Sequence, residues 1–216
     1  MSNCPERITT LFRDVGGVLL TDAWDRVARK KAALYFKLDH DIMQDRHHII
    51  AETFEPGKIT LEEYLKRVVF FDKQEFTGTD FREFMFAQSA AHAEMLSLIT
   101  EIKKVHSLKI VVVSNESRAR NEHRIKKFSL NELADCFISS SFVRLRKPDT
   151  DIFKLALDIS QAPAKQVVYF DDQIIFVRLA ERFGINIIDH TDYESTRTKL
   201  ASFGLGTINH SHDKTS

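Results

Sequence analysis

Short apolar runs alternate with helical patterns, most regularly in the second half of the chain. Five runs rich in Val, Ile and Phe predict β-strands, and they cover residues 8–12, 109–113, 136–139, 166–170 and 185–188. Two of these runs are apolar on both faces, at 111–113 and 167–170, as in parallel strands covered by helices on both sides. The alternation from residue 93 onward therefore predicts a parallel α/β sheet.

Helical periodicity separates these runs. Three stretches place apolar residues at spacings of three and four, so each presents one apolar stripe on an α-helix. The stripes are Met95/Leu98/Ile99/Ile102, Ile152/Leu155/Ala156/Ile159 and Ile175/Phe176/Leu179/Ala180/Phe183. Together the strands and helices predict a Rossmann-like core with a parallel sheet.

Residues 21–95 break this rhythm because they contain no convincing strand pattern. They carry helical patterns instead, one of which opens with Thr60-Leu61-Glu62-Glu63, the pattern of a capping box. A helical insertion of about 75 residues is therefore expected between the first strand and the rest of the sheet. We predict an α/β core domain of residues 1–20 and 96–216, with an α-helical cap domain of residues 21–95.

Composition narrows the class of protein. The 216 residues are 43% hydrophobic and 29% charged, so the chain can bury a full core and still present a polar surface. Lys+Arg and Asp+Glu are both 31, which gives a formal net charge of zero. Nucleic acids and anionic membranes attract an excess of positive charge, so neither is expected as the main partner.

The cysteines and the N-terminus indicate a location. Two cysteines, Cys4 and Cys136, are too few for a disulfide framework and suggest a reducing compartment. Charged residues interrupt the N-terminal stretch where a signal peptide needs an apolar run, and no stretch approaches the ~18 apolar residues of a membrane span. We expect a cytoplasmic globular protein, and the sequence leaves its oligomeric state open.

Polar residues follow the predicted strands. Open parallel sheets bind ligands at the carboxyl ends of their strands, near a switch in strand order. The side chains expected at that edge are those of Asp14, Ser114, Asn115, Lys147, Asp171 and Asp172. Three acids, a hydroxyl, an amide and an ammonium would therefore meet at one site.

This combination suits phosphoryl chemistry. Mg²⁺ prefers oxygen ligands and often binds one or two carboxylates together with substrate phosphate oxygens. A carboxylate can also be the nucleophile and form an aspartyl-phosphate. Ser114 and the backbone amides of Ser114 and Asn115 are candidates to hold phosphate oxygens, and Lys147 would offset the accumulated negative charge.

The same residues carry a family resemblance. The motifs are Asp14-Val15-Gly16-Gly17-Val18-Leu19, Val113-Ser114-Asn115, Arg146-Lys147-Pro148-Asp149 and Phe170-Asp171-Asp172. In order and at compatible spacing they resemble the four motifs of the haloacid dehalogenase-like (HAD) superfamily, and the helical insertion lies where that family has its cap. The resemblance implies a Mg²⁺-dependent hydrolase that acts on a small phosphorylated metabolite.

The resemblance also implies roles for these residues. Asp14 would be the nucleophile and a metal ligand, and Ser114 and Lys147 would bind phosphate. Asp171, Asp172 and the backbone carbonyl of Gly16 would complete the Mg²⁺ site. The acidic pair favours a phosphatase, because family members that act on carbon–halogen bonds dispense with those acids. Two alternatives remain: a catalytically degenerate protein that binds phosphorylated ligands, and a haloacid dehalogenase.

Gly16 departs from the family pattern. In the phosphatases of that family the residue two beyond the nucleophile is an aspartate that acts as general acid and base, and such catalysis is worth typically ~10²–10⁴-fold. Glycine cannot transfer a proton, so the sequence predicts a slow enzyme or one selective for good leaving groups. The alternative is that Glu116, Asp22 or a cap residue supplies the proton.

Two further positions are notable. Strand alternation points Arg13 away from the face that Asp14 serves, and a buried arginine paired with an acid is expected there. His47 and His48 are adjacent on a predicted helix, and we expect a solvated pair there and not a metal site.

Overall fold

Five parallel strands form one sheet in the order β3-β2-β1-β4-β5, in a computed structural model that describes residues 6–207. The strands are β1 (Thr10–Arg13), β2 (Lys109–Ser114), β3 (Cys136–Ser139), β4 (Val167–Asp171) and β5 (Asn186–Asp189). All five predicted strands are present, with ends that differ by one or two residues at most. The α/β, Rossmann-like fold class is confirmed.

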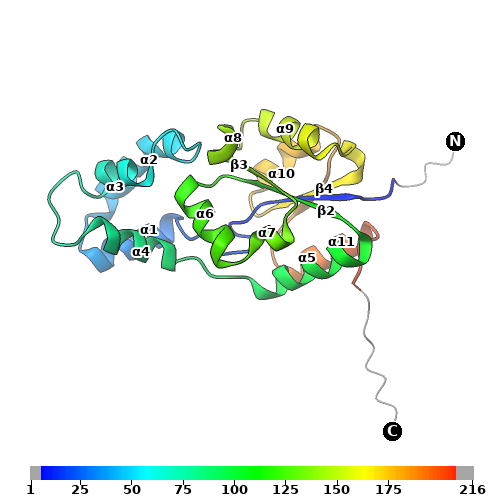
Figure 1. Ribbon diagram of the computed structural model, residues 1–216, viewed down its shortest axis with the longest axis horizontal. Coiled ribbons are helices and arrows are strands. Elements are labelled where there is room, and N and C mark those ends of the chain that lie inside the picture. Colours follow the sequence, from blue (N-terminus) through cyan, green and yellow to red (C-terminus); the bar gives the residue numbers. More distant parts are fainter. Residues whose placement is uncertain (1–5, 208–216) are drawn as a thin grey trace, which may run out of the picture.

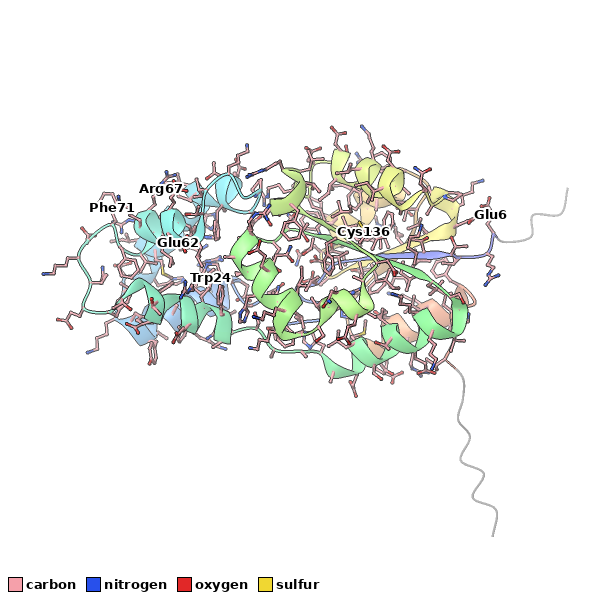
Figure 2. The ribbon with its side chains drawn as sticks, viewed as in Figure 1. Glu6, Trp24, Glu62, Arg67, Phe71 and Cys136 are labelled. Atoms are coloured by element: carbon pink, nitrogen blue, oxygen red, sulfur yellow. The ribbon has the colours of Figure 1, made fainter. Side chains whose placement is uncertain are left out.

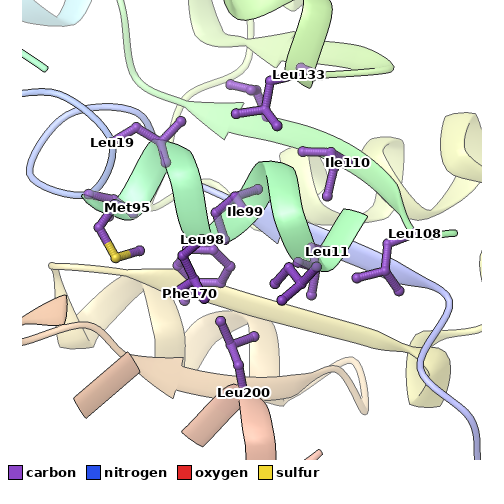
Figure 3. Close-up of a cluster of buried hydrophobic side chains, with 14 of the residues drawn as sticks. Leu11, Leu19, Met95, Leu98, Ile99, Leu108, Ile110, Leu133, Phe170 and Leu200 are labelled. Carbon is purple, nitrogen blue, oxygen red and sulfur yellow. The ribbon is translucent and has the colours of Figure 1, made fainter. Parts of the chain in front are cut away.

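Helices cover both faces of this sheet (Figure 1). The helices after residue 92 are α5 (Ala93–His106), α6 (Arg118–Lys127), α7 (Leu130–Leu133), α8 (Ser140–Val143), α9 (Asp151–Ser160), α10 (Ile174–Glu181) and α11 (Tyr193–Ser202). A 3₁₀ turn lies at Ala164–Gln166. One apolar core joins the sheet to α5 and α11, and a second joins it to α9 and α10. Figure 3 shows the first core, where Leu98 and Ile99 of α5 and Leu200 of α11 meet Phe170 of β4.

The predicted helical stripes are confirmed in part. All four stripe residues of α5 are buried, but Ile159 of α9 and Ile175 of α10 are 50% and 58% exposed. On α10 the predicted Ala180 is buried, and Phe176, Leu179 and Phe183 pack half-buried against the same core. Periodicity therefore selected the face of α10 that meets the sheet, with Val177 buried where Ile175 was expected.

Four helices form a group of their own at one end of the molecule (Figure 1). They are α1 (Arg26–Phe36), α2 (His40–Phe54), α3 (Leu61–Val68) and α4 (Gly78–Ala87), here called the helical segment. They share a separate apolar core that contains Trp24, Phe54 and Phe81. In Figure 2 the labelled Trp24, Glu62 and Phe71 lie in this part, and Cys136 lies in the sheet.

Local features of the helical segment agree with its sequence. The capping box is present, since Thr60 Oγ1 accepts from the Glu63 amide at 3.1 Å and Glu63 Oε2 accepts from the Thr60 amide at 2.8 Å. The division into a core domain and a cap domain of residues 21–95 stays a prediction. The helix α5 begins at Ala93, so the predicted boundary at residue 95 falls in its first turn.

The expectation of a solvated histidine pair is wrong for His47. The His47 side chain is buried, and its Nδ1 lies 2.9 Å from the hydroxyl of Tyr64, which also accepts a hydrogen bond from Trp24 Nε1 at 2.9 Å. Burial, followed by the charge of Arg29, lowers the pKa of His47 to about 3. This imidazole is therefore a neutral part of the core.

Other expectations concern the cysteines and the membrane. None of the helices within residues 6–207 has the length and apolar composition of a membrane span. Cys136 is a half-buried free thiol, and Cys4 lies outside the described residues.

Candidate functional site

The strand order brings the predicted site residues together. Strand β1 is central and pairs with β2 on one side and β4 on the other, with Arg13 opposite Val112 and Phe170. Asp14 directly follows β1, and Ser114 and Asp171 end β2 and β4. Parallel strands end at the same edge, so the three motifs converge there.

Three carboxylates form the centre of this site. One oxygen each from Asp14, Asp171 and Asp172 lies within 4.8 Å of the others. Hard divalent cations such as Mg²⁺ prefer such an all-oxygen set of donors, so the residues present fit this metal. Gly17 has a φ of +69°, and a Cβ there would collide with the carboxylate of Asp172. Glycine at this position therefore permits the close approach of the acid.

The ammonium of Lys147 lies among these carboxylates and is fully buried. Its Nζ is 2.5 Å from Oδ2 of Asp171 and 3.4 Å from Oδ1 of Asp14. Burial by itself lowers the pKa of Lys147, but the two carboxylates outweigh it and the net pKa is raised. Lys147 is therefore a fixed positive charge in the site.

Tyr169 is a site residue that the sequence analysis missed. Its hydroxyl donates a hydrogen bond to Oδ2 of Asp171 and lies 3.3 Å from Nζ of Lys147. It precedes Asp171 by two residues on β4, and side chains two apart on a strand share a face. The spacing of two residues between Tyr169 and Asp171 could therefore have identified Tyr169 from the sequence.

Asn115 positions the chain that carries Lys147. Its Nδ2 donates to the carbonyl of Lys147 at 2.7 Å, and its Oδ1 accepts from the Lys147 amide at 2.8 Å. These two bonds hold the side chain against the Lys147 backbone, and the backbone amide of Asn115 is its candidate phosphate donor. The hydroxyl of Ser114, by contrast, bonds to Asp14 itself and lowers the pKa of that carboxyl.

Crowding of the acids perturbs their ionisation. Burial, opposed by Lys147 and reinforced by Asp171, raises the pKa of Asp14 to about 7. Burial and the charge of Asp22 raise the pKa of Asp172 to about 6. Negative charge is therefore costly in this site, and a bound cation would relieve that cost.

The expectation of an acid paired with Arg13 is wrong. Arg13 is completely buried, and none of its three guanidinium nitrogens has a hydrogen-bond partner among residues 6–207. Burial lowers its pKa to about 9, although the charge of Asp14 opposes that shift. Arg13 shares the Leu11 face of β1, whose core is built of apolar side chains that offer the guanidinium no acceptor.

Two of the candidate proton donors differ sharply. Glu116 is buried, with its two oxygens 2.5 Å from Arg120 and 2.5 Å from Arg124. Asp22 is exposed, and its carboxylate lies beside Gly16: a Cβ built on Gly16 would be 2.8 Å from Oδ1 of Asp22. The structure therefore places a carboxylate next to the position where the first motif lacks one.

Comparison with known proteins gives consistent results. A family model described as haloacid dehalogenase-like hydrolase matches residues 42–189, more than half of the chain. The search of curated proteins returned no match. The structure search returned a HAD family enzyme of Bacteroides thetaiotaomicron, with 18% identity, a TM-score of 0.73, and coverage of 86% of this chain and 95% of that one. The same enzyme was also solved with magnesium and inorganic phosphate.

Two further solved structures share the fold. A predicted HAD-like hydrolase of Porphyromonas gingivalis has 18% identity and a TM-score of 0.66, and covers 91% of this chain and 98% of its own. The L-2-haloacid dehalogenase of Xanthobacter autotrophicus, with chloropropionic acid covalently bound, has 14% identity and a TM-score of 0.60, and covers 90% and 83%. At these identities the likeness shows the fold alone.

Proposed function

The chain belongs to the haloacid dehalogenase-like hydrolase family. From that premise we propose that it is a Mg²⁺-dependent phosphatase. It would act on a small phosphorylated metabolite through an aspartyl-phosphate at Asp14. One observation carries the proposal. The carboxylates of Asp14, Asp171 and Asp172 gather within 4.8 Å, and the buried ammonium of Lys147 touches two of them. This arrangement supports a site for a divalent cation and an anionic substrate together.

The metal would be held by Asp14, Asp171, Asp172 and the backbone carbonyl of Gly16. When bound, Mg²⁺ offsets the negative charge of the phosphoryl oxygens. The magnesium and inorganic phosphate bound to the Bacteroides enzyme of the same fold support this assignment.

The protein groups would act in two steps. An oxygen of Asp14 attacks phosphorus, so an oxygen–phosphorus bond forms while the bond to the leaving oxygen breaks. Lys147 and the hydroxyl and backbone amides of Ser114 and Asn115 hold the phosphoryl oxygens meanwhile. Water then attacks the same phosphorus, inorganic phosphate leaves, and the carboxylate of Asp14 is restored. Gly16 supplies no proton in either step.

Two alternatives compete with this proposal. A dehalogenase is supported by the Xanthobacter structure with its covalently bound chloropropionic acid. The pair Asp171 and Asp172 argues against it, because it fits the metal site that carbon–halogen chemistry does not use. A degenerate binding protein is supported by Gly16, which removes the acid and base of the first motif.

The test is release of inorganic phosphate from aryl, acyl and sugar phosphates, with Mg²⁺ or with chelator, against Asp14→Asn. We expect Mg²⁺-dependent release in the wild type and none above background in the variant. Binding of inorganic phosphate without release would establish the degenerate protein. Chelator-insensitive release of halide from 2-chloropropionate would establish the dehalogenase.

A further inference from the structure

The space beside Gly16 is occupied by a carboxylate from elsewhere in the chain. A Cβ built on Gly16 would lie 2.8 Å from Oδ1 of Asp22. Within an aspartate, ordinary bond lengths put the Cβ about 2.4 Å from its own carboxylate oxygens. Oδ1 of Asp22 is therefore nearly as close to that Cβ as the carboxylate oxygens of an aspartate at position 16 would be.

We propose that Asp22 replaces the missing acid of the first motif: it protonates the leaving group and then accepts the proton of the attacking water. The inference rests on the proposed phosphatase function and names the residue that the first motif lacks. Asp22 follows the nucleophile by eight positions, so no motif at position 16 reveals it.

The backbone on both sides of Asp22 is fixed. The amide of Thr21 donates to the carbonyl of Ala90 at 2.9 Å, and the carbonyl of Asp22 accepts from Trp24 at 2.7 Å and from Arg120 at 3.2 Å. Ala23, at a φ of 61°, turns the chain sharply back toward the buried Trp24. These contacts hold the Cα of Asp22 while its side chain stays exposed.

Neighbouring acids are not equivalent to Asp22. Both oxygens of Glu116 are engaged by Arg120 and Arg124. Oδ1 of Asp25 accepts from the amide of Ala28 at 2.7 Å as the N-cap of α1. The carboxylate of Asp22 has no hydrogen-bond partner among residues 6–207, so it is the one of these three that is free to bond to a substrate oxygen.

The proposed proton transfers balance over one turnover. In the first step the oxygen of Asp14 bonds to phosphorus, the bond to the leaving oxygen breaks, and that oxygen takes the proton of the Asp22 carboxyl group. In the second step water bonds to phosphorus and gives a proton to the Asp22 carboxylate, while the bond between phosphorus and Asp14 breaks. One water is consumed, and the alcohol and inorganic phosphate are released.

The experiment measures turnover for alkyl phosphates and for aryl phosphates of graded leaving-group pKa, in Mg²⁺. We expect a shallow dependence in the wild type. In Asp22→Asn, alkyl phosphates should lose about 10²–10⁴-fold and the most acidic aryl leaving groups much less, which gives a steep dependence. Asp25→Asn keeps an N-cap and serves as the matched control, with the wild-type dependence retained.

Relocating the acid provides the second arm. Gly16→Asp alone should gain little, because Asp22 already supplies the proton beside that position. Gly16→Asp combined with Asp22→Gly should restore a shallow dependence and much of the lost alkyl turnover. Affinity for inorganic phosphate, measured in every variant, reports whether the site is still folded.

The outcomes separate the two claims. No phosphate release by the wild type above Asp14→Asn would overturn the phosphatase function and the role of Asp22 with it. Release that Asp22→Asn leaves unchanged, or reduces equally for all leaving groups, would overturn the role of Asp22 alone.

Discussion

Lys147 and Asn115 contribute to the site in different ways, although they are bonded to each other. Removal of the ammonium in Lys147→Ala would leave three carboxylates without their internal cation, whereas Asn115→Ala removes two bonds to the Lys147 backbone and leaves the ammonium held by Asp171. We expect Lys147→Ala to lower affinity for inorganic phosphate about 10²–10³-fold, and Asn115→Ala about tenfold.

Calorimetric titration of each variant with inorganic phosphate in saturating Mg²⁺ measures this difference. Thermal denaturation in the same buffer checks that both variants fold. Equal losses of affinity would mean that the ammonium acts mainly through the position of its loop.

Arg13 is a costly side chain in the sheet. A buried guanidinium without hydrogen bonds has lost its hydration and gained little in return. Replacement of such charges by an apolar side chain of similar length is often stabilising, and we expect Arg13→Met to raise the free energy of unfolding by about 1–4 kcal/mol. Arg13→Lys keeps a buried charge and should give no gain. Urea denaturation of the two variants decides this, and a loss of stability in Arg13→Met would contradict the expected cost of the buried charge.

The positions of the site side chains could be predicted where they follow recognisable strand motifs. Contacts that only the folded chain creates could not be predicted in this way. Asp14, Ser114 and Asp171 each sit at a strand end, so a correct strand assignment already brings them together. The contact between Asp22 and position 16 depends on the turn between them, where the amides of Leu19 and Leu20 donate to the carbonyl of Val15, so the sequence could name Asp22 only as one of several possible proton donors.

At the scale of elements, apolar runs predicted the strands well because parallel strands are buried on both faces. All five positions of β4 are buried, and a short run that is apolar on both faces is the sequence pattern of such a strand. The helical stripes were predicted with single exceptions: Phe176, Leu179, Ala180 and Phe183 of the α10 stripe pack on the core, but Ile175 and its neighbour Ile174 are exposed. Their exposure near the site edge is a tertiary property that a period of 3.6 residues does not contain.

The packing of α2 on α3 makes the stability of the molecule depend on pH. His47 is buried and neutral against Tyr64, and its pKa is lowered from 6.5 to about 3. Below pH 6.5 the unfolded chain binds a proton that the folded chain refuses, so the free energy of unfolding falls as the pH drops toward 3. Above pH 6.5 the imidazole is neutral in both the folded and the unfolded chain, so the free energy of unfolding keeps its full value. We expect a loss of about 1–2 kcal/mol from His47 between pH 7 and pH 5.

Urea denaturation at these two pH values, in wild type and in His47→Phe, isolates that contribution. The variant loses the bond to Tyr64 and should be less stable at pH 7, but its stability should fall less on acidification. His48→Gln removes the exposed neighbouring imidazole and should retain the wild-type slope. A slope unchanged in His47→Phe would place the proton uptake elsewhere.

At the scale of the whole molecule, the loop between α2 and α3 closes the helical segment onto the core. Ser140 Oγ donates to the carbonyl of Glu55 at 2.8 Å, and the Glu55 carboxylate pairs with Arg146 at 2.8 Å. Arg144 donates to the carbonyl of Pro56 at 3.1 Å. In this arrangement Lys147 has no exposed surface. We expect the helical segment to move when substrate enters and is enclosed, with the chain crossings near Thr21 and Met95 as its hinges.

Gly57 offers a way to weaken this closure from a single position. Its φ is +67°, and a Cβ there would lie 3.0 Å from the carbonyl oxygen and 3.1 Å from the Cβ of Ser141, across the contact between loop and core. Gly204 also has a positive φ, of +78°, but a Cβ there would meet nothing within 4 Å. Alanine at either position strains the backbone similarly, so only the contact across the loop differs.

We therefore expect Gly57→Ala to open the closed arrangement and Gly204→Ala to leave it closed. In Gly57→Ala the amides of residues 55–58 and 140–144 should exchange hydrogen faster, since the loop can no longer seat on α8. Inorganic phosphate should associate and dissociate faster as well, because entry to the site is limited by opening. Hydrogen exchange and stopped-flow binding compare the two alanine variants directly. Equal exchange and equal association rates in the two variants would show that the contact at Gly57 does not control access, and that the helical segment opens independently of it.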